Sequence, residues 1–360
     1  MPRVRRAERP GVGMLPLPAL RVGGLRVTLP VLDVRKRGVE FLERRVHAVL
    51  NPPESTKMGF WSLNPYVGCE FGCAYCYARF AHAYGVQRAE ASGVLPAETR
   101  KRLAAVNHPW QTFERAIFVK RGFEDALVRD LRRLARRAER QTVALGTATD
   151  PYQPAERTYR LTRRALETLV SVPLQPGLRI SIVTKSPLVT RDAEVLRRLS
   201  GRHMVAVHLS IITLDPAVIR LIEPRSPLPH ARLRALRRLA DAGIPVGIFC
   251  APVLPGITDD VRTLRELFRA AADAGARFAP GCALRVYGGA RAPLLHALER
   301  SLPRIAARYR ERYRRAREAP EAYRKALSQR MRRLRDEVGL RPAAFDEDVP
   351  VGERQMTLWG

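Results

Sequence analysis

Three cysteines lie within eight residues, at Cys69, Cys73 and Cys76. Gly68 and Gly72 each stand directly before a cysteine and give this short segment backbone freedom. Iron–sulfur clusters are held by cysteine thiolates, so three thiolates on one loop can bind three irons of a [4Fe–4S] cluster. The fourth iron is then left without a protein ligand and can bind a substrate or cofactor. The spacing therefore predicts an open-site iron–sulfur cluster.

A structural zinc ion is the main alternative for these cysteines. Zinc normally takes four protein ligands, and the fourth would have to come from His82, Cys250 or Cys282. Disulfides fit poorly, because the chain has five cysteines, an odd number, and no export context. Cysteines that are merely buried would not cluster beside glycines at this spacing.

The length and composition fit one large α/β domain with extensions. The chain has 360 residues, of which 46% are hydrophobic, enough to bury a sizeable core. No run of 18 apolar residues occurs, so we expect no membrane span and no membrane partner. Pro16 and Pro18 interrupt the weakly apolar N-terminal stretch, which does not resemble a signal peptide. Together with thiolate–iron chemistry, this predicts a cytoplasmic location.

The formal net charge of +29 favours a polyanionic partner, so DNA or RNA is a candidate. Only six of the 64 basic residues are lysine, however. A GC-rich coding sequence would also produce an excess of arginine alongside abundant alanine, glycine and proline. Nucleic-acid binding is therefore a hypothesis that the charge raises and does not settle.

Short apolar runs alternate with helical patterns after Trp61, which predicts repeated βα units and a parallel sheet. We expect strands over residues 61–67, 142–145, 179–183, 204–212, 245–252 and 277–287. Helices are expected over residues 77–84, 155–170, 190–199 and 261–274, with helical pattern also between 213 and 242. Six such units in about 225 residues fit a partial (β/α)6 barrel better than a closed eightfold barrel. The loops after the strands would then build the active site.

The chain divides into four predicted segments. Residues 1–53 form a partly disordered N-terminal extension, and residues 54–292 form the core barrel. Residues 293–341 form a C-terminal extension of two basic helices broken near Pro320, and residues 342–360 form an acidic and then apolar tail. Arginines interleave with Tyr309, Tyr313 and Tyr323 in the basic helices. We expect these tyrosines to pack, and leave phosphate contact open for the arginines.

Five motifs accompany the predicted strands and extend the pattern beyond the cysteines. They are SLNPYVGCEFGCAYCYAR, GTATDPYQPAE, VTKSP, LSIITLD with EPRSP, and APVLPGITD. In these motifs the chain resembles the radical S-adenosylmethionine (SAM) superfamily, in the branch of spore photoproduct lyase and the DNA repair photolyase-like proteins. The resemblance implies a [4Fe–4S] cluster on the three cysteines, with the amino and carboxylate groups of SAM chelating the open iron.

The resemblance also implies an activity. One electron from an external donor of the flavodoxin or ferredoxin type would split SAM into methionine and a 5′-deoxyadenosyl radical, which abstracts hydrogen from a substrate. A lyase or transferase acting on a nucleic-acid base, in repair or modification, is the leading expectation. Modification of a protein or a small metabolite is the first alternative. A non-catalytic iron–sulfur or zinc protein that binds nucleic acid is the second.

Several strand-end residues match SAM contacts of the lyase branch. Thr149, beside Asp150, matches a serine that meets the SAM amino group. Lys185 matches a lysine that pairs with the SAM carboxylate, and Ser210 matches a hydroxyl at the same end of SAM. A cation offsets a carboxylate, and hydroxyls orient it by hydrogen bonds. The plainer alternatives are a solvated lysine and, for Thr149 and Asp150, a turn or helix cap before Pro151.

Two further positions are expected near the adenine of SAM. Tyr75 occupies the position that lies beside the adenine in the family, although a core tyrosine would explain it equally well. Val253 and its neighbours are expected to line the adenine pocket through backbone groups.

One departure from the lyase pattern matters. The lyase has a hydrogen-donating cysteine directly before the hydroxyl residue of the second strand motif, where this chain has Ala148. The lyase's repair route is therefore not expected here. Cys250 and Cys282 lie at or near other strand ends, where a buried, inert thiol is the commoner outcome. Glu223 and Arg225 are expected to form an ion pair, structural rather than ribose-facing.

Overall fold

The computed structural model describes residues 31–345, apart from 36–37, 57, 107, 137–140 and 175. Most of the predicted disordered N-terminus and of the acidic and then apolar tail lies outside these residues. The predicted domain boundaries stay a prediction.

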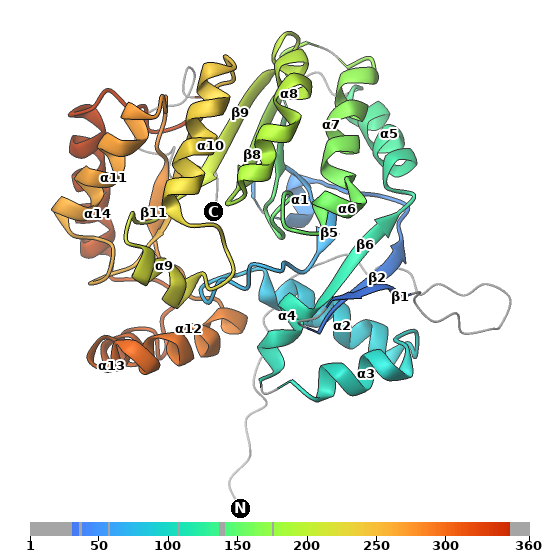
Figure 1. Ribbon diagram of the computed structural model, residues 1–360, viewed down its shortest axis with the longest axis horizontal. Coiled ribbons are helices and arrows are strands. Elements are labelled where there is room, and N and C mark those ends of the chain that lie inside the picture. Colours follow the sequence, from blue (N-terminus) through green and yellow to red (C-terminus); the bar gives the residue numbers. More distant parts are fainter. Residues whose placement is uncertain are drawn as a thin grey trace, which may run out of the picture.

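A sheet of seven strands forms the centre of the described part of the chain, in the order β11-β10-β9-β8-β7-β4-β3 (Figure 1). Neighbouring strands are parallel, except that β3 runs antiparallel to β4 at one edge. The strands are β3 (Leu50–Asn51), β4 (Trp61–Leu63), β7 (Thr142–Leu145), β8 (Arg179–Thr184), β9 (Met204–Ser210), β10 (Val246–Val253) and β11 (Gly281–Ala283). The six parallel strands confirm the predicted partial (β/α)6 barrel.

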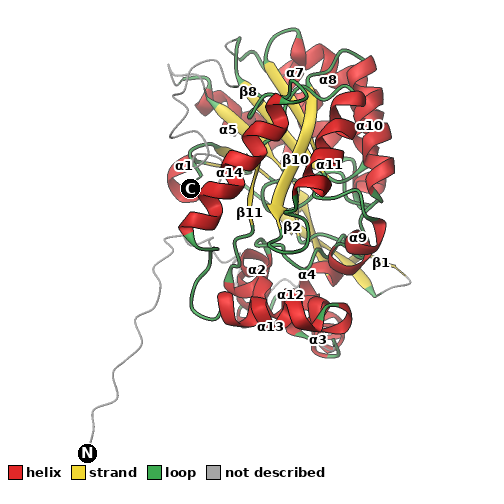
Figure 2. Ribbon diagram, turned by 90° about the vertical axis from the view of Figure 1, so that its left-hand side faces the viewer, coloured by secondary structure: helices red, strands yellow, loops and turns green. Residues whose placement is uncertain are grey.

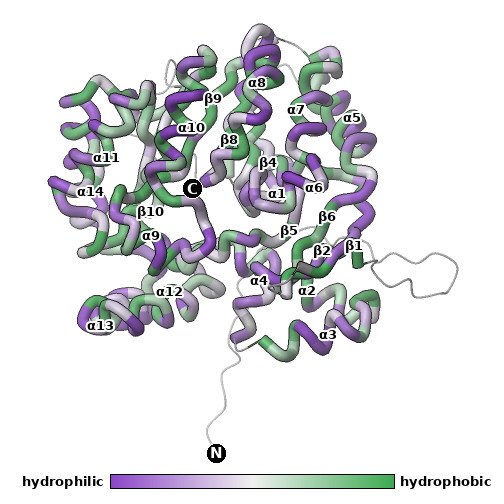
Figure 3. Tube along the Cα trace, in the orientation of Figure 1, coloured by the Kyte–Doolittle hydropathy of each residue, from purple (hydrophilic) through white to green (hydrophobic). Residues whose placement is uncertain are grey.

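Helices cover the outer face of these strands (Figures 1 and 2). They are α5 (Phe123–Leu134), α6 (Glu156–Tyr159), α7 (Leu161–Ser171), the 3-10 helix η2 (Pro187–Asp192), α8 (Ala193–Ser200), α10 (Pro229–Asp241) and α11 (Val261–Asp273). Helix α9 (Pro216–Ile222) lies instead beyond the strand ends, where it packs with α12 (Gly288–Ser301) and the cysteine loop (Figure 1). Helix α11 shows why the covering helices pack: Leu264, Leu267, Phe268 and Ala271 recur at helical spacing and are buried. Figure 3 shows the resulting pattern, with apolar strands beneath helices of mixed polarity.

Strand alternation separates two faces of the sheet. In β8, Ile180 and Ile182 belong to the main hydrophobic core, while Ser181 between them points to the inner face. Gly247 of β10 stands between the core residues Val246 and Ile248, so it also lies on the inner face. Small residues therefore recur on the inner side of the barrel.

A second sheet of four strands was not predicted. Its order is β1-β2-β6-β5, and its strands are β1 (Val31–Arg35), β2 (Val39–Arg45), β5 (Tyr66–Val67) and β6 (Ala116–Arg121). The single predicted strand over 61–67 is wrong, because β4 pairs with β7 while β5 pairs with β6 in the other sheet. Asn64 and Pro65 separate the two, and proline cannot donate a ladder hydrogen bond. The chain thus passes from one sheet to the other just before the cysteines.

The remaining helices surround the strand ends or the C-terminal edge. They are α1 (Pro53–Thr56), α2 (Arg79–Ala91), α3 (Ala97–Ala104), η1 (Pro109–Gln111), α4 (Thr112–Arg115), α12 (Gly288–Ser301), α13 (Pro303–Arg312) and α14 (Glu321–Asp336). Tyr309 and Tyr313 are buried, and the Tyr309 hydroxyl donates to the Pro255 carbonyl at 2.9 Å. Packing is therefore confirmed for these two tyrosines. No helix in the described ranges is long and apolar enough to cross a membrane.

Gly247 provides a test of how closely β10 packs against Phe278, in the segment before β11. A methyl group there would collide with the carbonyl oxygen and ring of Phe278, so we expect Gly247→Ala to lower the free energy of unfolding by about 1–3 kcal/mol. Gly85→Ala in α2 is the matched control, because nothing lies within 4 Å of its added methyl group, and alanine should stabilise that helix slightly. Urea denaturation of both variants measures the difference. Equal stability of the two would contradict this packing.

Candidate active site

The cysteine loop follows β5 and is fixed by backbone contacts on both sides. Gly68 has a φ of +89°, and a side chain there would come within 2.8 and 2.9 Å of the Ala116 and Phe113 carbonyl oxygens. The Cys69 amide donates to the Phe113 carbonyl at 3.1 Å, and the Ala74 amide donates to the Ile222 carbonyl at 2.8 Å. The loop is therefore bound to α4 and to the end of α9.

Arg79, in the first turn of α2, fixes the cysteine loop through hydrogen bonds to its backbone. Its Nη2 donates to the carbonyls of Gly72 at 2.9 Å and Cys73 at 3.0 Å, and pairs with Glu114 at 3.0 Å. Its Nη1 donates to the Trp110 carbonyl at 2.7 Å. The sequence pattern did not identify Arg79, because one arginine after the cysteines carries no recognisable spacing.

The three thiols fit an iron–sulfur cluster by their chemistry. Cys69 and Cys73 are buried and Cys76 is partly buried, all on one short loop. Burial raises the pKa of all three thiols, that of Cys73 to about 12, while the Lys185 ammonium opposes the shift at Cys73. Loading the cluster must displace these protons, and the partly buried Lys185 helps to compensate for thiolate charge. Such soft sulfur donors suit iron–sulfur clusters.

His82, one of the residues that could supply the fourth ligand of a structural zinc ion, makes other contacts. Its Nε2 lies 2.8 Å from the Ala116 carbonyl oxygen, and its ring packs against Phe113 and Phe118. Within the residues that the structure describes, no three His, Cys, Asp or Glu side chains converge on a single metal ion.

A buried network of charges lies against the loop. The Tyr75 hydroxyl donates to Glu223 Oε1, and the Lys185 ammonium lies 4.0 Å from the same oxygen. Arg232 and the Ser226 hydroxyl, the latter at 2.9 Å, donate to Glu223 Oε2. Lys185 Nζ also lies 5.6 Å from the centre of the Tyr75 ring. Tyr75 and Lys185, both expected near SAM, are thus brought together.

The charges in this network stabilise one another. Burial alone would raise the pKa of Glu223, but Arg232 and Lys185 outweigh it and hold that pKa below its ordinary value. Burial works against the charged form of Lys185, yet Cys73 and Glu223 outweigh it and raise the pKa. Both groups therefore stay charged beside the cysteines. The predicted Glu223–Arg225 pair is wrong. Arg232 of α10 pairs with Glu223, and Arg225 pairs with Glu114 at 3.0 Å.

Thr149 and Asp150 anchor the loops after β7. Thr149 Oγ1 donates to the Gly68 carbonyl at 2.6 Å and accepts from Gln153 Nε2 at 2.9 Å. Asp150 accepts from Thr184 Oγ1 at 2.6 Å and from the Lys185 amide at 2.7 Å. Burial raises the pKa of Asp150, and these hydrogen bonds oppose the rise. Both residues thus position Cys69 and Lys185, and their contact with SAM stays a prediction.

Ser210 is the last residue of β9, and Val253 is the last residue of β10. Ser210 is buried, and its carbonyl accepts from Arg232 Nη1 at 2.6 Å, so Arg232 joins β9 to Glu223. Val253 is buried, and its carbonyl accepts from the Leu284 amide at 2.9 Å. Their contacts with SAM also stay predictions.

Ala148, which stands where the lyase has its hydrogen-donating cysteine, is held by the side chain of Asn64 at the end of the neighbouring strand β4. The Ala148 amide donates to Asn64 Oδ1 at 2.8 Å, and Asn64 Nδ2 donates to Ser62 Oγ at 2.8 Å. Cys250 is fully buried in the main core, and the thiol of Cys282 lies near Arg285 and Glu318. Burial raises the pKa of Cys250 to about 12, as expected of an inert thiol.

The comparison with protein families decides the assignment. The model of the radical SAM superfamily matches residues 63–268, from the end of β4 through the cysteine loop and strands β7 to β10 into α11. The chain belongs to the radical SAM superfamily. Radical SAM proteins use a [4Fe–4S] cluster and SAM, so these are its cofactors.

Two curated relatives of this radical SAM protein cover 95% and 61% of its length. An uncharacterized protein of Mycobacterium tuberculosis is 32% identical over 95% of this chain and 94% of its own. One from Methanocaldococcus jannaschii is 25% identical over 61% of this chain and 70% of its own.

Solved structures of spore photoproduct lyase share the fold. A mutant form has a TM-score of 0.56 at 17% identity, covering 84% of this chain and 81% of the lyase. A form with bound AdoMet and dinucleoside spore photoproduct has a TM-score of 0.54 at 18% identity, covering 78% of this chain and 75% of the lyase. The resemblance to this branch is confirmed at the level of fold.

We expect Glu223→Gln to lower the free energy of unfolding by about 3–5 kcal/mol. The substitution keeps the shape but leaves the fully buried Arg232 and the partly buried Lys185 without their counter-charge. Glu266→Gln, which breaks an exposed pair with Arg262, should change stability by no more than about 0.5 kcal/mol. Guanidinium denaturation compares the two. Similar small losses would show that the buried network contributes little.

Proposed function

We propose that this radical SAM protein is an enzyme that cleaves SAM reductively and directs the resulting 5′-deoxyadenosyl radical at a nucleic-acid base. The observation that carries the proposal is the position of Lys185, a partly buried lysine at the end of β8 whose ammonium lies 5.6 Å from the centre of the Tyr75 ring in the cysteine loop. A cluster needs the thiols, and the carboxylate of a cofactor such as SAM needs a cation beside it. The cluster, when bound, supplies the electron that cleaves SAM.

The residues of this chain would hold and orient the cofactors. Cys69, Cys73 and Cys76 would bind three irons, and Lys185 would offset the SAM carboxylate. The buried ring of Tyr75 keeps the lysine in place and limits the access of water. The hydrogen bonds of Thr149 to Gly68 would keep the loop in register with β7.

A nucleic-acid substrate is supported by two observations. The net charge of +29 favours a polyanion, and the spore photoproduct lyase that shares the fold has been solved with a dinucleoside spore photoproduct. With alanine at position 148, we propose modification or repair by a route other than the lyase's, of lyase or transferase type. A cytoplasmic location and an external one-electron donor complete the proposal. Modification of a protein or small metabolite remains the alternative.

We expect anaerobically reconstituted protein to form 5′-deoxyadenosine from SAM when dithionite is added. Cys73→Ala should reduce this product at least a hundredfold, because the cluster loses a ligand. Cys282→Ala, a partly exposed cysteine outside the loop, is the control and should retain activity. Chromatography of the nucleoside measures both. A loaded wild-type cluster that yields no 5′-deoxyadenosine would refute the proposed activity.

Lys185→Ala should weaken SAM binding about tenfold or more, about 1.4 kcal/mol, because it removes a partly buried cation and leaves Glu223 facing the SAM carboxylate. Lys325→Ala, at an exposed ion pair on α14, should leave the affinity unchanged. Anaerobic titration of the reconstituted protein with SAM gives both dissociation constants. Unchanged binding in Lys185→Ala would mean that SAM lies elsewhere.

A further inference from the structure

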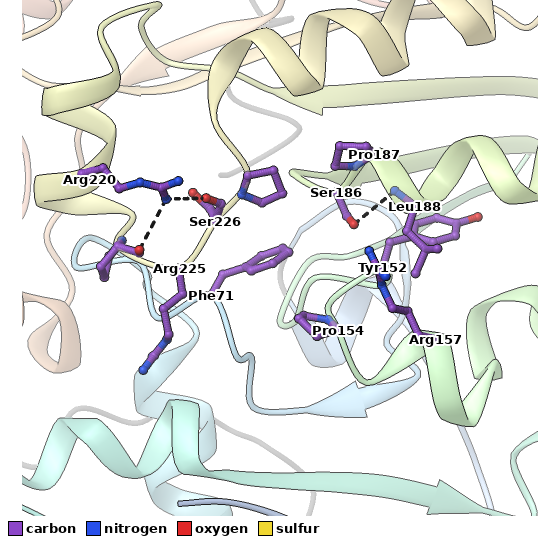
Figure 4. A pocket seen from close by; sticks show the side chains of 12 residues that line it. Phe71, Tyr152, Pro154, Arg157, Ser186, Pro187, Leu188, Arg220, Arg225 and Ser226 are labelled. Carbon is purple, nitrogen blue, oxygen red and sulfur yellow. Dashed lines mark hydrogen bonds between the residues drawn. The ribbon is translucent and has the colours of Figure 1, made fainter. Parts of the chain in front are cut away.

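A pocket of about 560 Å³ opens between the cysteine loop and the loops after β7, β8 and β9 (Figure 4). Most of its residues come from three of the sequence motifs, DPYQPAE, VTKSP and EPRSP, and Phe71 comes from the cysteine motif. The lining comprises Phe71, Tyr152, Pro154, Arg157, Ser186, Pro187, Leu188, Arg220, Pro224, Arg225, Ser226 and Pro227. The proposed SAM chemistry assigns no role to these residues.

The pocket reaches the cysteine loop without passing the predicted SAM site. Phe71 stands between Cys69 and Cys73 in the loop and forms part of the pocket wall. Neither the three cysteines nor any residue expected at SAM contributes to the lining. A molecule in this pocket would therefore touch the cluster-binding loop while leaving the substrate's side of it free.

The charge of the pocket has one sign. Arg157, Arg220 and Arg225 line it, and none of its lining residues is acidic, but Glu114 outside the lining pairs with Arg225 at 3.0 Å, so the pocket's positive charge comes from Arg157 and Arg220. Backbone carbonyls of Ser226, at 2.9 Å, and Pro224, at 3.4 Å, fix the Arg220 guanidinium without neutralising it. Arg157 is exposed. Arginine held in this way presents a preformed site for carboxylates or phosphates.

The walls of the pocket are stiff. Pro154, Pro187, Pro224 and Pro227 restrict the backbone, and Ser186 Oγ accepts from the Leu188 amide at 3.3 Å. A preformed surface costs little ordering entropy when a partner binds. The pocket is therefore suited to a short-lived encounter with another protein.

We propose that this pocket is the docking site of an acidic protein that carries one electron to the cluster. The proposal rests on the proposed function, which consumes one electron for each SAM cleaved. In the transfer, the reduced flavin or iron–sulfur carrier loses one electron, the cluster gains it, and no covalent bond forms. Charge complementarity favours an acidic carrier. A nucleic-acid substrate must instead reach the SAM side of the loop.

The test uses the full-length, reconstituted protein with a reduced flavodoxin as the acidic donor. We expect Arg157→Glu to slow cluster reduction, followed as bleaching of its visible absorbance, about tenfold, and to weaken binding of oxidised flavodoxin by a similar factor. Arg220→Gln should act in the same direction. The wild-type rate should fall as salt is added, and the Arg157→Glu rate should fall less steeply.

Two controls separate docking from other effects. Arg262→Glu reverses an exposed charge on α11, away from the pocket lining, and should leave the flavodoxin rate unchanged. Dithionite, a small reductant, should reduce all variants equally and support equal 5′-deoxyadenosine formation. If dithionite yields no 5′-deoxyadenosine in the wild type, the proposed function fails, whereas the docking proposal is judged by flavodoxin binding.

Three results would overturn the docking proposal. The first is a wild-type protein that neither binds flavodoxin nor is reduced by it. The second is an Arg157→Glu variant that behaves like Arg262→Glu towards flavodoxin. The third is an Arg157→Glu variant that loses affinity for a short DNA duplex and keeps its flavodoxin rate, which would assign the pocket to phosphodiester binding.

Discussion

A charge that is buried away from water must be paired. In this protein the buried carboxylate of Glu223 takes its partners from several elements of the fold. Its side chain and that of Arg232 are both fully buried, and each of the two carboxylate oxygens accepts from a different part of the fold. Arg232 also donates to the Ser210 carbonyl and so joins α10 to the end of β9. Because an unpaired charge at this depth would cost several kcal/mol, the cysteine loop, β8, β9 and α10 are held in one arrangement.

The same arrangement determines what the cysteines can do. Tyr75 lies between two cluster cysteines and is fixed through its hydroxyl to Glu223, while Lys185 lies over its ring. The loop is held on its other side by Arg79 and by the close approach of Gly68 to α4. Structural and chemical roles therefore overlap: Thr149 and Asp150, expected at SAM, also position the loop and the lysine.

The second sheet explains where the loop lies. The chain leaves β4, turns at Asn64 and Pro65, and enters β5 in a different sheet directly before Gly68. Asn64 remains tied to the first sheet, since its side chain binds Ser62 and the Ala148 amide. The cysteine loop consequently begins where the chain passes between the two sheets, and its Phe71 forms part of the wall of the arginine-lined pocket.

The sequence by itself determined the parallel strands, the cluster cysteines and the burial of Tyr309 and Tyr313, because periodicity and ligand spacing are local properties. Strand β6, with the apolar run Ala116–Val119, and the amphipathic helix α5 carried similar local signals that were overlooked. Only the tertiary structure decided that Glu223 pairs with Arg232 rather than with Arg225. Helix α10 carries four arginines between 232 and 238, and helical spacing places Arg232 alone on the buried face, with Ala235, Leu236 and Leu239. Periodicity therefore indicates which arginine is buried, but only the packing of α10 brings it to Glu223, where each buried charge needs a partner.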